Sequence, residues 1–167
     1  MSEVSNKLEP ILREADAFLM ASRCIELESR KHMVSNVRLY VSLRDAYHVN
    51  HAYAFELYLK LFLVRENREY KGFKESHKLI EIFNKISPEI KEMIVTDYEK
   101  NKGSKILIGN IAPTFEHVLN ALPSPFYDYR YKWEGRNKIK ETYLLRHAIH
   151  SVRNVIKILE PDLKGYS

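Results

Sequence analysis

The chain has 167 residues, of which 45% are hydrophobic and 29% charged, and its formal net charge is +5. This balance indicates one folded domain and excludes a disordered chain. Few glycines and prolines argue against an all-β sandwich. The lack of a long apolar run excludes a membrane-spanning helix, and the first ten residues do not resemble a signal peptide, so we expect a cytoplasmic protein.

Apolar residues recur at helical spacing through most of the chain, which predicts an all-α fold. The first helix is expected at about 3–29, with Ser2 as its N-cap and with a later start or a bend at Pro10. The single cysteine, Cys24, falls in this helix and is interpreted as a small core residue. Residues 30–41 fit either a loop or an early start to the second helix.

The second helix, at about 43–66, has a centre that is apolar almost all round. Such a helix must be covered by several neighbours, which predicts the central helix of a bundle. The only polar strip on its helical wheel holds Tyr53, Glu56 and Lys60. Glu56 and Lys60 are four residues apart in the favourable order, so we expect them to pair along a solvent-exposed edge.

Four more helices complete the predicted bundle. They are expected at about 77–86, from Ser87-Pro88 to about 102, at about 113–122, and at about 138–160 before Pro161. The sequence therefore predicts one domain over 1–167, an up-and-down bundle of five or six helices.

Positive charge is concentrated in the C-terminal part of the chain. Residues 101–167 hold eleven Lys or Arg against six Asp or Glu, whereas residues 1–100 hold sixteen of each. In the last helix the basic or titratable side chains fall on one strip beside the apolar face: Arg146, His150, Arg153 and Lys157. This strip either binds phosphate, pairs with acids of a neighbouring helix or second subunit, or is simply solvated.

The segment 126–135 before the last helix is dense in aromatic residues, and Arg130 and Lys132 lie among them. Its rings either stack on unpaired bases or pack across the bundle, with Arg130 against a ring or a buried acid such as Glu56. The two histidine pairs with helical spacing lack a completing carboxylate or thiolate, and no phosphate-binding glycine loop is present. We expect no metal and no other cofactor.

Four features together resemble the HEPN family of helical nucleotide-binding domains. Residues 56–60 (Glu-Leu-Tyr-Leu-Lys) are similar to the family's Glu-Leu-x-x-Lys pattern, and residues 77–83 to its His-Asp-Leu-x-x-Leu segment. Residues 129–134 resemble an aromatic-Arg-Tyr-x-aromatic-Glu stretch, and a long amphipathic helix follows. The resemblance covers about 45–160, with 1–41 as an N-terminal helix and connector.

The resemblance implies a helical bundle that forms homodimers and acts in defence, toxin–antitoxin pairs or RNA processing. A cognate antitoxin or nucleotidyltransferase is then an expected partner. It also implies structural roles for the residues of the shared motifs: Glu56, Lys60, His77, Tyr131 and Trp133.

Active members of the family are metal-independent ribonucleases with an Arg-x(4–6)-His motif near the last helices. Here Arg146 and His150 are separated by only three residues, and Arg44-x6-His51 has the spacing but lies at the start of the second helix. Both pairs remain candidates for catalysis, because histidine can move a hydroxyl proton and arginine can stabilise phosphate charge. The leading hypothesis is nonetheless an RNA-binding or nucleotide-binding module without catalysis, with an endoribonuclease and a protein-interaction scaffold as alternatives.

Overall fold

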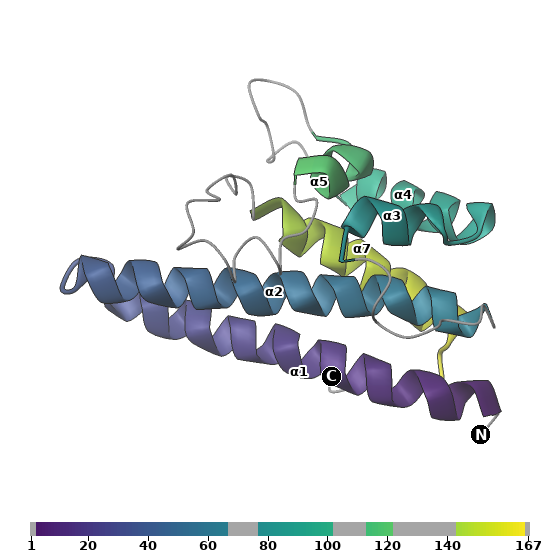
Figure 1. Ribbon diagram of the computed structural model, residues 1–167, viewed down its shortest axis with the longest axis horizontal. Helices are drawn as coiled ribbons and strands as arrows, with labels where there is room; N and C mark the ends of the chain where they lie inside the picture. Colours follow the sequence, from purple (N-terminus) through teal and green to yellow (C-terminus); the bar gives the residue numbers. More distant parts are fainter. Residues whose placement is uncertain (1–2, 67–76, 102–112, 122–142, 166–167) are drawn as a thin grey trace.

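The computed structural model describes residues 3–66, 77–101, 113–121 and 143–165. These residues form six helices and no strand, which confirms the predicted all-α class. Helices α1 (Glu3–Lys31) and α2 (Val37–Arg65) form a long antiparallel hairpin (Figure 1). Above it lie α3 (Leu79–Asn84), α4 (Pro88–Asn101) and α5 (Phe115–Ala121), and α7 (Tyr143–Leu159) packs against both α2 and α4.

Interactions between neighbouring residues set where the two helices of the hairpin begin and end. The Asn36 side chain accepts a hydrogen bond from the Leu39 backbone N–H at 3.0 Å, which caps α2 at its first turn. The ambiguous segment 30–41 is therefore the end of α1, a short turn and an early start to α2. Helix α1 runs through Pro10, and the exposed Asn6, whose carbonyl loses its helical partner there, can bind water instead.

The centre of α2 lies in the core, as its sequence predicts. Phe55, Leu59 and Phe62 are fully buried, and each such side chain contributes about 1.5–3 kcal/mol when removed from water. Phe115 of α5 connects the second layer to this core. Its ring centroid lies 6.2 Å from Phe55 of α2, 5.1 Å from Phe83 of α3 and 5.4 Å from Tyr98 of α4.

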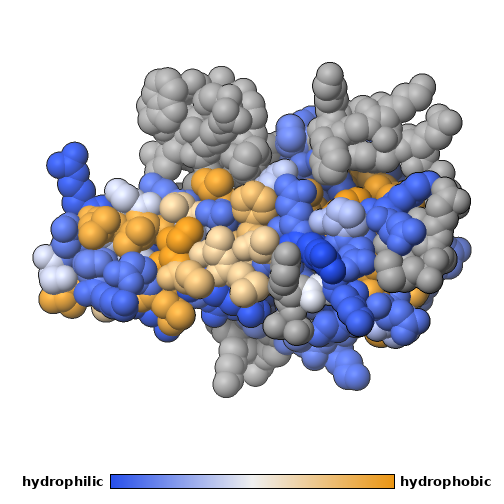
Figure 2. Space-filling view, turned by 90° about the horizontal axis from the view of Figure 1, so that it is seen from below, coloured by the Kyte–Doolittle hydropathy of each residue, from blue (hydrophilic) through white to orange (hydrophobic). Residues whose placement is uncertain are grey.

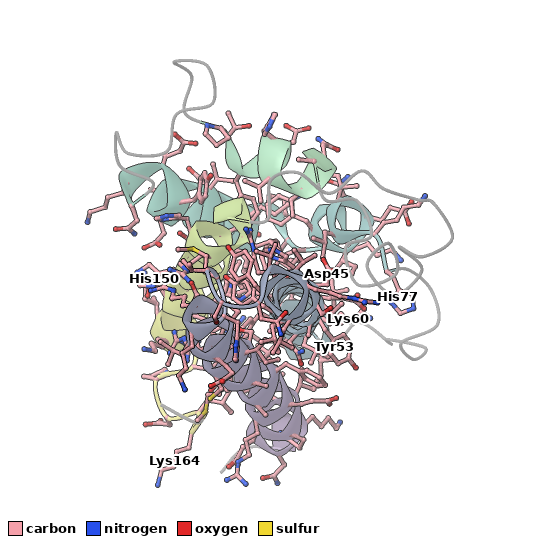
Figure 3. All side chains as sticks on the ribbon, turned by 90° about the vertical axis from the view of Figure 1, so that its left-hand side faces the viewer. Asp45, Tyr53, Lys60, His77, His150 and Lys164 are labelled. Atoms are coloured by element: carbon pink, nitrogen blue, oxygen red, sulfur yellow. The ribbon has the colours of Figure 1, made fainter. Side chains whose placement is uncertain are left out.

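The Glu56–Lys60 pair forms as expected, but its predicted place on a solvent-exposed edge is wrong. Glu56 is 0% exposed and Lys60 is 1% exposed. The Glu56 carboxylate accepts hydrogen bonds from Lys60 Nζ and, at 3.0 Å, from His77 Nδ1, which enters just before α3. Lys60 and His77 lie together on the side of the molecule away from His150 (Figure 3). Charges can be buried here because they neutralise each other.

The apolar face predicted for the last helix is confirmed, because Leu145, Ala148, Ile149, Val152 and Ile156 are buried. The expectation for Cys24 is wrong, since this residue is exposed on the outer face of α1. The N-cap predicted at Ser2 lies outside the described residues. No helix in the described ranges has both the length and the apolar character needed to span a bilayer.

Candidate anion-binding site

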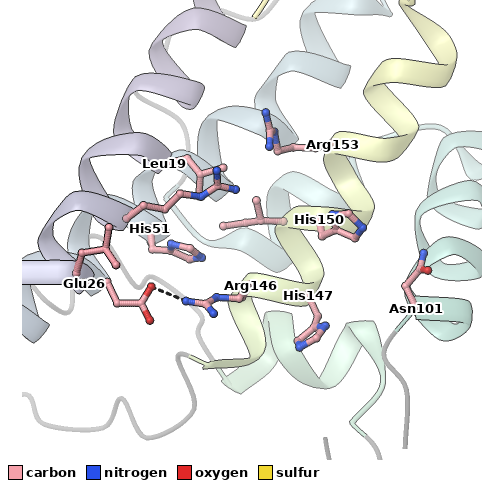
Figure 4. A pocket seen from close by; sticks show the side chains of 11 residues that line it. Leu19, Glu26, His51, Asn101, Arg146, His147, His150 and Arg153 are labelled. Atoms are coloured by element: carbon pink, nitrogen blue, oxygen red, sulfur yellow. Dashed lines mark hydrogen bonds and ion pairs between the residues drawn. The ribbon is translucent and has the colours of Figure 1, made fainter. Parts of the chain in front are cut away.

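A pocket of 640 Å³ opens between α1, α2 and α7 (Figure 4). We call it the arginine pocket, because three arginines line it: Arg23 from α1, and Arg146 and Arg153 from α7. Among the residues that the structure describes, three histidines also line it, and Glu26 is its one acidic residue. Within the described ranges, the lining residues are Leu19, Arg23, Glu26, Leu27, His51, Asn101, Arg146, His147, Ile149, His150 and Arg153.

Arg146 is held at the pocket by an acid on the facing helix. Its Nη2 donates to Glu26 Oε2 at 2.6 Å, while Glu26 Oε1 accepts a second bond from Arg30 at 2.8 Å. Burial raises the pKa of Glu26, but the bonds from Arg30 and Arg146 outweigh it and lower the pKa below 4.5. Since 54% of the Arg146 side chain stays exposed, its guanidinium remains accessible to a ligand.

Arg153 is bound more firmly to the hairpin. Its Nη2 lies 3.0 Å from Oδ1 of Asp16, a buried acid on α1, and its guanidinium lies 5.7 Å from the centre of the Tyr58 ring. The Tyr58 hydroxyl donates to the same carboxylate oxygen. Burial and this contact with Asp16 raise the pKa of Tyr58. Arg153 therefore fastens α7 to α1, and Asp16 offsets most of its charge.

His51 is the most deeply buried titratable group of the pocket, at 3% exposure. Its Nδ1 lies 3.0 Å from Ser22 Oγ on α1. Burial, together with the positive charge of Arg146, lowers the pKa of His51 to about 4. The imidazole is thus neutral at physiological pH.

His150 lies exposed at the pocket mouth, where its Nε2 is 3.3 Å from the Asn154 amide nitrogen, which also contacts Asp97 of α4. Lys157 instead lines a neighbouring pocket of 500 Å³ with Asp16 and the C-terminal residues up to Gly165. Two members of the strip predicted on the last helix, Arg146 and Arg153, thus pair with acids of α1, one of the expected alternatives, while His150 and Lys157 line the two pockets.

The structure brings together one of the two candidate catalytic pairs and separates the other. Arg146 and His150 do line one pocket, but Arg44 is exposed and contacts Tyr40 through its side chain, 3.3 Å from the hydroxyl. Arg44 and His51 are two helical turns apart, about 10 Å along α2. His51 therefore shares its pocket with Arg146 of α7 rather than with Arg44.

Two groups of predicted residues complete the picture. Lys60 and His77 both contact Glu56, as described above, and the roles implied for them by the HEPN resemblance stay predictions. The aromatic-basic segment lies outside the described residues, so its predicted members have no structural account: Arg130, Tyr131, Lys132 and Trp133.

Sequence reasoning missed the contribution of α1. Asp16 and Glu26 continue the apolar stripe of that helix, four residues after Leu12 and four after Ser22. An acid within a core stripe predicts a basic partner on the helix packed against it. Arg146 and Arg153 are those partners. Arg23, which completes the pocket, carries no such signal.

Within the described ranges, no group of three His, Cys, Asp or Glu residues is arranged to hold a metal ion. Comparison of the chain with models of known protein families, with curated proteins and with solved structures finds no significant match. The functional assignment therefore depends on the geometry of the arginine pocket and on the motifs of the sequence.

Proposed function

We propose that the chain is a helical module of HEPN type that binds RNA or a nucleotide through the arginine pocket, without catalysis. The observation that carries this proposal is the convergence of Arg23, Arg146 and Arg153 from two helices, against one acid among the lining residues that the structure describes. Guanidinium groups bind phosphate through paired hydrogen bonds, and three of them around one cavity favour an anionic ligand.

Two of these arginines are available to a ligand. Arg23 is exposed and makes no hydrogen bond or ion pair with any residue that the structure describes. Arg146 has Glu26 as its acid partner, which lies on the pocket wall, so an incoming phosphate can take the place of that carboxylate. The pocket thus supports two phosphate contacts, while Arg153 keeps the two helices in place.

The HEPN resemblance supplies the biological setting of the proposal: a stress or defence system in the cytoplasm, with a cognate antitoxin or nucleotidyltransferase as partner. The resemblance also predicts that the chain forms a homodimer. Large apolar side chains exposed in the half of the hairpin nearer its closed end support self-association: Met20, Leu27, Met33, Val34, Val37, Leu39 and Val41. Figure 2, which views the molecule from the α1 side, shows hydrophobic residues gathered toward that end.

A metal-independent endoribonuclease is the second candidate, because Arg146 and His150 line the same pocket. Efficient proton transfer needs groups whose pKa lies near the working pH. His51, with a pKa of about 4, is a weak base at neutral pH, which argues against His51 as the base of such a reaction and leaves Arg146 and His150 as its candidate pair. Cleavage that persists in EDTA and is lost in His150→Ala would establish the second candidate instead.

Fluorescence anisotropy with a labelled short single-stranded RNA tests the proposal. We expect Arg146→Gln and Arg23→Gln each to weaken binding about tenfold to a hundredfold, since a hydrogen bond to a charged group contributes about 1.5–3 kcal/mol. Each loss should also reduce the slope of log affinity against log salt by about 0.7. Glu26→Gln should tighten binding by about threefold. The substitution removes the ion pair that competes with the ligand for Arg146, and the gain in binding free energy should equal that of an exposed ion pair.

Arg13→Gln is the matched control. Arg13 is an exposed arginine of α1, the helix that carries Arg23, and like Arg146 it pairs with an acid, Glu9, but it lies outside the arginine pocket. It should leave RNA affinity unchanged. Equal losses in the Arg13 and Arg146 variants would show that net charge alone drives binding and would refute the pocket. A chain that binds no RNA, but forms a stable complex with another protein, would support the scaffold hypothesis instead.

A further inference from the structure

The His51 ring is fixed in one protonation pattern by a hydrogen-bond chain that leads from α2 back to α1. The Ser22 hydroxyl donates to the backbone carbonyl of Leu19 at 2.7 Å. A serine hydroxyl carries one hydrogen, so Ser22 Oγ can only accept in its contact with His51 Nδ1 at 3.0 Å. Nδ1 therefore bears the proton of the neutral imidazole, and Nε2 bears a lone pair.

That lone pair has no partner. His51 Nε2 is buried and, within the described part of the chain, makes no hydrogen bond. The residue nevertheless lines the arginine pocket, as Arg23 and Arg146 do, and Figure 4 shows its ring near Arg146. A buried acceptor without a donor costs about 1–3 kcal/mol, so a ligand that supplies the donor recovers this energy.

The lone pair also restricts the chemistry of that ligand. An unprotonated ring nitrogen repels the oxygens of a phosphate, so His51 adds nothing to phosphate binding itself. The group placed against it must be an O–H or N–H that lies close to the phosphate held by the arginines. In nucleic acids, the ribose 2′-hydroxyl is such a donor, and deoxyribose lacks it.

We propose that His51 Nε2 accepts a hydrogen bond from a ribose 2′-hydroxyl next to the phosphate bound by Arg146 and Arg23, so that the pocket selects RNA over DNA. This inference rests on the proposed function and assigns the ligand class of the same site. His51 is a binding residue in this arrangement, and Ser22 is a positioning residue. The proposed arrangement includes a displacement of Arg146 from Glu26 by the phosphate, because His51 Nε2 is buried and must be uncovered for the hydroxyl to reach it.

The low pKa of His51 is consistent with this role. Burial and the nearby charge of Arg146 keep the ring neutral across the physiological range. A protonated ring would carry a hydrogen at Nε2 and could only donate. The same cation that binds the phosphate therefore helps to preserve the acceptor beside it.

Three labelled single strands of one sequence test the inference by anisotropy: RNA, its 2′-O-methyl form and DNA. The 2′-O-methyl strand keeps an oxygen at this position but cannot donate. We expect RNA to bind about threefold to tenfold more tightly than either of the others, the range for one net hydrogen bond. Equal affinity for RNA and 2′-O-methyl RNA would overturn the role of His51, while the proposed function would survive. Failure of the chain to bind any strand would refute both.

His51→Asn separates the acceptor from the rest of the pocket, because the asparagine amide can still donate to Ser22 but has no atom at the Nε2 position. RNA affinity should fall to that of the 2′-O-methyl strand, while affinity for DNA stays unchanged and shows that the variant is folded. His117→Asn, at an exposed histidine of α5 outside the pocket, is the matched control and should preserve the preference for RNA. A retained preference in His51→Asn would overturn the inference.

The tautomer can be measured without any ligand. Imidazole ¹⁵N chemical shifts of the full chain should identify His51 as protonated at Nδ1 and unprotonated at Nε2 near neutral pH. Ser22→Ala should release this restriction, so that the shifts become those of a mixture of tautomers and the preference for RNA decreases. A wild-type His51 protonated at Nε2 would contradict the hydrogen-bond chain and the inference with it.

Discussion

Lys60→Met is the most direct test of the buried charge cluster in the core. The substitution keeps a long unbranched side chain but removes the ammonium group that neutralises Glu56, which is fully buried. Removing one partner of a buried ion pair costs about 3–5 kcal/mol, because the remaining charge stays away from water. For a chain of this size, about 1 kcal/mol lowers Tm by roughly 2–4 °C, so we expect a fall of about 6–20 °C.

Urea and thermal unfolding followed by far-UV circular dichroism measure this loss. Lys78→Met is the matched control, because Lys78 pairs with Glu81 at 2.7 Å while both side chains are largely exposed. That variant should change stability by less than about 1 kcal/mol. The double variant Glu56→Gln/Lys60→Met should recover most of the loss, since it buries no uncompensated charge. If Lys60→Met were no more destabilising than Lys78→Met, the reasoning about burial would be wrong.

Two further predictions concern pH and assembly. The folded pKa of His51, about 4, lies below its unfolded value near 6.5, so the stability it contributes is present above pH 6.5 and is lost as pH falls toward 4. Urea unfolding at about pH 7 and about pH 4.5 should show a loss of about 2 kcal/mol that His51→Asn removes, and an equal loss in that variant would contradict the low pKa. Light scattering after size-exclusion chromatography should find a homodimer that Val37→Glu converts to a monomer, because Val37 is exposed at the apolar end of the hairpin. Asp45→Lys, at a polar position further along α2, should leave the dimer intact; a wild-type monomer would refute the assembly.

Helix positions were largely predictable, because helical periodicity and caps are local properties. The apolar centre of α2, Ser87-Pro88 before α4 and Pro161 after α7 mark these elements from a few neighbouring residues. The start of α2 at Val37 stayed one of two alternatives for residues 30–41, because its signal is a single side chain, Asn36. The basic strip of the last helix followed from the same periodicity, and so did its position beside the buried face.

The HEPN resemblance and the RNA-binding function stay predictions, and so does the homodimer. The sequence suggested Arg146/His150 and Arg44/His51 because spacing along one helix is all that a linear pattern can show. The structure instead joins Arg146 to His51 through the packing of α7 against α2.

The amino-acid pattern was enough to place the helices and their apolar faces, because each depends on residues within a few turns of one another. Packing decided the rest. A polar strip holding Glu56 and Lys60 has the same periodicity whether it meets solvent or a neighbouring segment, and here His77 lies against it. In the same way, Asp16 and Glu26 determine the partners of Arg153 and Arg146 only once α1 and α7 are in contact, since electrostatic and hydrogen-bond energies depend on distance in space rather than along the chain.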